Sequence, residues 1–83
     1  MQQDNSILTR VAQVLAQVVK INQSQITRDS RLREGLGIDS LSMIDVAVTA
    51  EDTFGVRISD EDTERFETVG DMVDFLNRAG VAT

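Results

Sequence analysis

The chain has 83 residues, enough for a single domain spanning 1–83, and it contains no Cys, His, Trp or Tyr. Without Cys and His it lacks a thiol nucleophile, the commonest general base and the commonest transition-metal ligands, so we expect no catalytic residue and no metal site. The net charge is −6, with eleven acidic and three basic residues in 39–83, a balance that argues against nucleic-acid binding and favours basic patches on protein partners.

The first predicted helix begins near residues 4–6, where Asp, Asn and Ser are all favoured as N-caps. Lys20 is expected to close it as a cation in the last turn. Apolar residues recur between these ends at helical spacing, which predicts an amphipathic helix. They are Ile7, Leu8, Val11, Val14, Leu15, Val18 and Val19.

Residues 21–38 are expected to form a long loop pinned to the core. The connection exceeds the usual length of about 4–6 residues, and loops of this length inside small domains are usually functional. Its spaced apolar anchors and its two glycines are Ile21, Ile26, Leu32, Gly35 and Gly37.

Three further helices are predicted after this loop. The second spans about 40–54, with Gly55 placed to end it. A short third helix follows Ser59 as N-cap, and a fourth follows Thr68, each with an acid three residues later. The tail from Arg78 is expected to fray, and residues 56–58 are too short and isolated to form a strand. The expected class is all-α, a four-helix bundle with a short third helix and a long first loop.

The second helix has two apolar faces. At about 100° per residue, one arc forms the core face and the opposite arc carries a second stripe with an acidic rim. An exposed apolar stripe ringed by carboxylates is typical of a docking surface, although the stripe would also fit packing under the long loop. The core face is Met43, Val46, Ala47, Ala50 and Phe54; the stripe is Leu41, Ile44 and Val48; the rim is Asp45, Glu51 and Asp52.

Ser40 lies where the glycine-punctuated loop meets the second helix. A helix N-terminus is a ready phosphate site, because its first N–H groups lack partners and the helix dipole is positive there. Asp39 and Ser40 are both good N-caps, so one reading of the pair is capping alone. If Asp39 is the cap, Ser40 is spare and its hydroxyl points outward beside the stripe.

The junction Leu36-Gly37-Ile38-Asp39-Ser40-Leu41 resembles that of the acyl carrier protein family. The resemblance also covers Phe54-Gly55-Val56-Arg57-Ile58, the acidic short helix and the Thr68-Val69-Gly70-Asp71 entry to the last helix, and it extends over roughly 5–77. It implies that 4′-phosphopantetheine is attached to Ser40 by a phosphopantetheinyl transferase, from coenzyme A. Asp39 matches the position that helps the transferase and its metal to engage. Because the chain has no Cys, the arm would supply the thiol for acyl thioesters, and the protein would be a carrier rather than an enzyme.

The resemblance also implies partners and an acyl cavity. The partners are enzymes with basic patches, such as an acyl-carrier synthase, ketoacyl synthase, reductase, dehydratase or acyltransferase. Reversing the charge of Asp45 and Glu51 is expected to weaken turnover and leave the fold intact. The docking positions are Leu41, Ile44 and Val48, with Asp45, Glu51, Asp52, Asp60 and Glu64 as the acidic ones. The cavity lining would be Met43, Val46, Ala47, Ala50, Phe54, Ile58, Phe66 and Met72.

Some residues depart from the family pattern. Ser42 stands where many members carry an acid, and Arg31, Arg33 and Glu34 replace part of a typically acidic approach to the junction. The run from Asp39 to Met43 is similar to carriers of very long-chain, mycolic-type fatty acids.

Alternatives to the fatty-acid reading remain open at this point. One is a carrier for polyketide or nonribosomal peptide synthesis, and another is an unmodified helical adaptor that binds partners through the second helix. The sequence has no apolar run long enough to span a membrane and no signal peptide, so the cytoplasm is the default expectation. We also expect a monomer.

Overall fold

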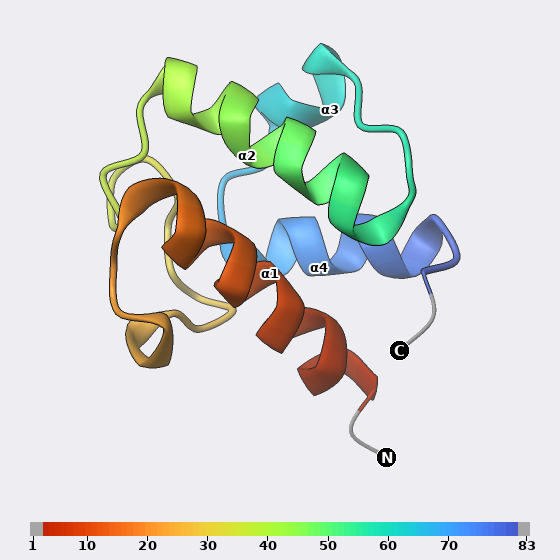
Figure 1. Ribbon diagram of the computed structural model, residues 1–83, viewed down its shortest axis with the longest axis horizontal. Helices are drawn as coiled ribbons and strands as arrows, with labels where there is room; N and C mark the ends of the chain where they lie inside the picture. Colours follow the sequence, from red (N-terminus) through yellow and green to blue (C-terminus); the bar gives the residue numbers. More distant parts are fainter. Residues whose placement is uncertain (1–2, 82–83) are drawn as a thin grey trace.

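The computed structural model describes residues 3–81, and the side chains from Ile7 to Val81. Within this part of the chain there are four α-helices and one short 3₁₀ turn (Figure 1). The predicted all-α class, with a shorter third helix and a long first loop, is confirmed. The elements are α1 (Gln3–Val19), η1 (Gln23–Gln25), α2 (Ser40–Phe54), α3 (Asp60–Arg65) and α4 (Val69–Arg78).

The helices enclose one apolar core. α1 packs against both α2 and α4, and α3 packs against α2 (Figure 1). Each long helix turns one apolar stripe inward, which removes that surface from water and supplies most of the driving force for folding. The large side chains that are almost fully buried include Ile7, Leu15, Leu32, Ile38, Met43, Met72 and Leu76.

The predicted caps set the helix ends. Asp39 is the N-cap of α2, and Gly55 ends that helix in the left-handed conformation with a φ of 69°. Ser59 and Thr68 form capping boxes at the starts of α3 and α4. These ends depend on neighbouring residues only, which is why the sequence predicts them.

The two ends of α1 differ from expectation. The helix begins at Gln3, so residues 4–6 lie inside it, and their side chains are outside the described ones. Lys20 is expected in the last turn of α1. It lies just beyond the helix instead, with a φ of 55°. Its N–H still donates to the Ala16 carbonyl at 3.1 Å, and the left-handed turn lets Ile21 pack against the core.

The long loop is held at two levels. Ile26, Leu32 and Ile38 are buried, and Ile21 is half-buried against the same core, so the predicted pinning is confirmed. In addition, its backbone pairs with the segment that leads into α4, through an isolated antiparallel bridge between Arg31 and Thr68. The hydrogen bonds are Leu32 N–H to Glu67 O, Val69 N–H to Ser30 O and Gly70 N–H to Arg28 O, each 2.9 Å long.

The end of α4 is better ordered than predicted. Arg78 belongs to the helix, and Gly80 follows in the left-handed conformation with a φ of 85°. The N–H of Gly80 donates to Asn77 O and that of Val81 to Leu76 O, the pattern of a Schellman motif. Val81 is half-buried against the core, so the prediction of fraying is wrong as far as residue 81, and residues 82–83 lie outside the described part.

Candidate functional site

Ser40 is the first residue of α2, and its side chain is exposed. Its neighbour Asp39 carries the capping role, since the Asp39 carboxylate accepts a hydrogen bond from the Ser42 N–H at 2.8 Å. The Ser40 hydroxyl makes no hydrogen bond with any other residue that the structure describes. The serine is therefore free of a structural task at the helix start.

The cap also fixes the charge beside Ser40. The backbone N–H of Ser42, and secondly its side chain, hold the pKa of the Asp39 carboxyl below its ordinary value of 3.8. Hydrogen bonds donated to a carboxylate favour its charged form. Ser42 thus helps to keep Asp39 ionised.

A cavity of about 200 Å³ opens beside Ser40, between α2 and α3. Thr63 is its buried polar wall residue, and the Thr63 hydroxyl is satisfied because it donates to the Ser59 carbonyl at 2.9 Å. The spacing of Thr63 from Ser59, four residues apart in a helix, is the only sequence signal for this contact. The cavity is lined by Arg33, Ser40, Met43, Ile44, Asp60, Thr63 and Glu64.

The residues predicted to line an acyl cavity are mostly packed in the core. Met43 is the member of the set that reaches the cavity beside Ser40. Phe54 is half-buried against the core, and the Arg10 guanidinium lies 4.5 Å from the centre of its ring. The other members are buried in the core cluster: Val46, Ala47, Ala50, Ile58, Phe66 and Met72.

The second apolar face of α2 is exposed. Leu41, Ile44 and Val48 have 72%, 53% and 55% of their surface accessible, and they are the exposed large hydrophobic residues in the described chain. The opposite face of α2 is buried, so the prediction of two apolar faces is confirmed. The stripe does not pack under the long loop.

The predicted acidic positions fall into two groups. Asp45, Asp52, Asp60 and Glu64 are exposed. Glu51 is half-buried, and its Oε2 accepts a hydrogen bond of 2.7 Å from the N–H of Ile58. Glu51 therefore has a task inside the fold, which sequence reasoning missed because the contact spans the turn after α2.

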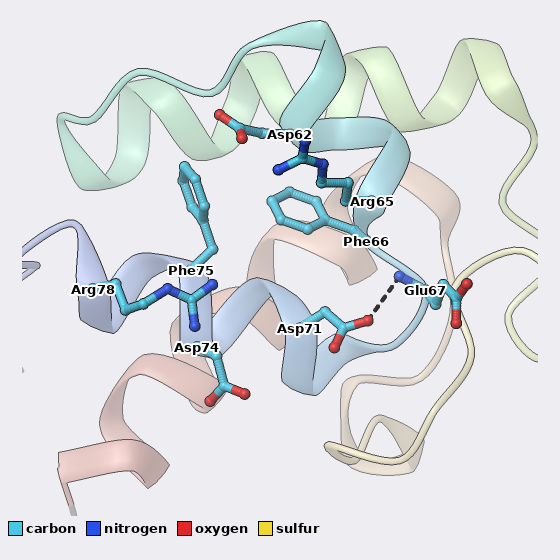
Figure 2. Close-up of a pocket in the computed structure, with 8 residues that line it drawn as sticks. All are labelled: Asp62, Arg65, Phe66, Glu67, Asp71, Asp74, Phe75 and Arg78. Carbon is cyan, nitrogen blue, oxygen red and sulfur yellow. Dashed lines mark hydrogen bonds between the residues drawn. The ribbon is translucent and has the colours of Figure 1, made fainter.

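A second hollow of about 270 Å³ lies between α3 and α4 (Figure 2). The rings of Phe66 and Phe75 meet edge to face in it, with their centres 5.4 Å apart. Its Asp71 is spent on capping α4, since it accepts the N–H groups of Glu67 and Thr68 (the Glu67 bond is dashed in Figure 2). Ser40 does not line this hollow, so the smaller cavity is the better candidate site.

The described residues 3–81 contain no group of three or more acidic, His or Cys side chains that could hold a metal ion. Among the same residues, no helix has the length and apolar character needed to cross a membrane.

Comparison with known proteins adds to this geometry. Residues 9–76 match the family described as "Phosphopantetheine attachment site". The acyl carrier protein of Acidothermus cellulolyticus is 41% identical over 76 residues, which cover 92% of this chain and 90% of that protein. The acyl carrier protein of Thermotoga maritima is 33% identical, over 87% of this chain and 89% of its own length. The meromycolate extension acyl carrier protein of Mycobacterium leprae is 40% identical, over 87% of this chain and 63% of its own length.

The chain belongs to the acyl carrier protein family. It carries acyl groups on 4′-phosphopantetheine. Acyl carrier proteins are generally not catalysts, and they interact with phosphopantetheinyl transferases and with enzymes of fatty-acid synthesis.

Proposed function

We propose that Ser40 is the attachment point of the 4′-phosphopantetheine arm. The observation that carries this proposal is the free hydroxyl of Ser40 at the start of α2, exposed and relieved of capping by Asp39. The cavity beside it offers a partly apolar wall against which an arm and its cargo can lie. The residues present therefore fit the group.

The chain's own part in attachment is to present one oxygen atom. The Ser40 Oγ forms a bond to phosphorus, the bond between that phosphorus and the nucleotide part of coenzyme A breaks, and the hydroxyl proton passes to the transferase. Asp39, ionised beside the serine, would help the transferase and its metal to engage. When bound, the arm supplies the thiol that a chain without Cys lacks.

We propose that partners dock on the exposed face of α2 and on α3. Leu41, Ile44 and Val48 would enter apolar depressions, surrounded by a polar rim as in typical interfaces. The acids would meet basic patches on the transferase and on the synthases, reductases, dehydratases and acyltransferases of the pathway. Glu51 adds its charge to this surface while holding Ile58. The acids are Asp45, Glu51, Asp52, Asp60 and Glu64.

We propose that the acyl chain enters through the cavity beside Ser40. Met43 forms both the cavity wall and part of the core, so its displacement would lead the chain toward the other predicted lining residues. The relatives named for meromycolate extension support a long-chain fatty acid as cargo. We further propose that the chain does no catalysis itself. A cytoplasmic location, a monomeric state and a single domain over 1–83 stay predictions from the sequence.

Intact-mass spectrometry tests the attachment. The purified chain is incubated with coenzyme A and a broad-specificity phosphopantetheinyl transferase, and the mass is measured before and after. We expect wild type to gain one arm and Ser40→Ala to gain none. Ser42→Ala is the matched control, because it removes a neighbouring hydroxyl and keeps the backbone N–H that Asp39 binds; it should gain the arm. An arm on Ser40→Ala, or none on folded wild type, would contradict the proposal.

A further inference from the structure

Arg33 is the basic residue of the cavity beside Ser40. It lies on the long loop, is exposed, and forms no ion pair or hydrogen bond with another residue of the described chain. Its neighbour Arg31 does pair, with Glu34 at 3.0 Å. The Arg33 guanidinium, with its five N–H donors, is therefore available to a group bound at this cavity.

The surroundings of Ser40 are otherwise negative. Asp60 and Glu64 line the same cavity, and Asp39 precedes the serine. The helix N-terminus offsets this only in part, because the Ser42 N–H already bonds to Asp39. A phosphodiester on the Ser40 oxygen adds one more negative charge to this group of carboxylates, at a cost that a nearby cation would reduce.

We propose that Arg33 pairs with the phosphodiester on Ser40 and positions the near end of the arm over the cavity between α2 and α3. This inference rests on the proposed attachment at Ser40. A guanidinium matches phosphate oxygens with two parallel N–H donors, which fixes direction as well as charge. Because Arg33 is exposed, salt screens the pair. We therefore expect it to raise the ratio of arms held over the cavity to arms free in solvent by about 2–5-fold only. Arg33 is a positioning residue of this chain.

Phosphorus NMR of the loaded protein tests the pairing. Wild type, Arg33→Gln and Arg33→Lys are loaded with excess transferase, and intact mass confirms the arm on each. Arg57→Gln, an exposed arginine on another loop, is the matched control. At low salt we expect the phosphodiester signal of Arg33→Gln to be shifted and narrower than that of wild type and Arg57→Gln. Arg33→Lys should fall between them, since an ammonium keeps the charge and loses the fork. High salt should bring wild type toward Arg33→Gln.

A second NMR measurement tests the pairing in wild type alone, without a variant. The Nε–H resonance of Arg33 in wild type is compared before and after loading, and we expect it to move on loading and return at high salt. Suppose that wild type loads, but the Arg33 resonance does not move on loading and the phosphorus signal is the same in wild type and Arg33→Gln. The inference about Arg33 is then wrong, while the attachment at Ser40 stands. A loss of turnover with a partner enzyme in Arg33→Gln, without either NMR change, would likewise overturn it. If wild type gains no arm, the proposed attachment itself fails.

Discussion

Asp39 and Ser40 divide two tasks that either residue could perform. Asp39 satisfies the helix start through the Ser42 N–H, and this leaves the Ser40 hydroxyl exposed beside a cavity. The division matters because, if Ser40 capped the helix, modification of its hydroxyl would disturb the cap of α2. With Asp39 as cap, modification of Ser40 leaves the capping hydrogen bond of α2 in place.

Replacing Asp39 by Asn should change the acid stability of the protein. The hydrogen bonds from Ser42 lower the pKa of Asp39 in the folded state below 3.8, so the carboxylate stabilises the fold at neutral pH and this contribution disappears as the pH falls through the lowered pKa. Asn still accepts the Ser42 N–H but does not titrate. Thermal melts from neutral to acid pH should show a wild-type Tm that falls more steeply than that of Asp39→Asn. Asp29→Asn is the control. If the Tm of Asp39→Asn falls with pH as steeply as that of wild type and of Asp29→Asn, the stabilising role of the Asp39 carboxylate is contradicted.

Glu51 should matter to stability as well as to docking. Glu51→Ala leaves the buried Ile58 without an acceptor for its N–H, which should lower the free energy of unfolding by about 1–3 kcal/mol. Glu51→Gln keeps an acceptor oxygen and should lose less. Urea denaturation measures both, with Asp52→Ala as an exposed neighbour expected to change by about 0.5 kcal/mol or less. Equal stability of Glu51→Ala and Asp52→Ala would show that the bond contributes nothing. The sequence-based expectation that charge reversal at Glu51 spares the fold is therefore replaced.

At the scale of elements, α2 serves two surfaces at once. One face supplies buried residues to the core and the other presents three exposed apolar residues. Its length and both ends follow from local signals, the Asp39 cap and Gly55 in the left-handed conformation. A helix of this kind couples attachment and docking, because Ser40 and the stripe share a single rigid backbone.

The neighbours Met43 and Ile44 on opposite faces of α2 should give opposite phenotypes on truncation. Met43→Ala removes an almost fully buried side chain and should cost about 2–5 kcal/mol of unfolding free energy. Ile44→Ala should change stability by about 0.5 kcal/mol or less and raise the KM of a partner enzyme for the loaded carrier. Denaturation and steady-state kinetics on both variants provide the comparison. An Ile44→Ala variant with unchanged KM would refute docking through the stripe.

The sequence predicts those parts of the fold that depend on near neighbours. The caps at Ser59 and Thr68 and the two faces of α2 are confirmed, since each depends on spacing within a few residues. Of the two candidate caps for α2, Asp39 and Ser40, the structure uses Asp39. The turn after α4 differs from the predicted fraying because Gly80 ends the helix in a Schellman motif that holds Val81 against the core. The cavity beside Ser40 and the place of Arg33 in it could not be predicted, because they arise where the loop, α2 and α3 meet in space.

At the scale of the whole molecule, charge is distributed unevenly. The net charge is −6, and the acids concentrate in the part of the chain that contains α2, α3 and α4. Such a surface attracts basic partners over distances near the Debye length, but it repels itself in the folded state. Stability should therefore depend on the ionic strength.

Added salt should raise the Tm of the isolated protein. Screening weakens repulsion among the acids of the folded state more than among those of the expanded chain. Differential scanning calorimetry in NaCl and in MgCl₂ at matched ionic strength measures the effect. Equal increases would indicate screening, and a larger increase with Mg²⁺ would indicate cation binding as well. A Tm that does not change with either salt would exclude appreciable self-repulsion.

The backbone pairing between residues 28–32 and 67–70 has a consequence for cooperativity. The loop that leads to Ser40 is fastened to the start of α4 by main-chain hydrogen bonds, and Ile38 N–H bonds in turn to Leu32 O at 3.0 Å. The close approach also depends on Gly70, where an added Cβ would lie 3.2 Å from Arg28 O. In amide hydrogen exchange, Leu32, Val69 and Gly70 should therefore open as one unit. In a chain that ended before residues 67–70, the loop leading to Ser40 would lose these main-chain hydrogen bonds. The surroundings of Ser40 are therefore complete only once the last helix has been synthesised.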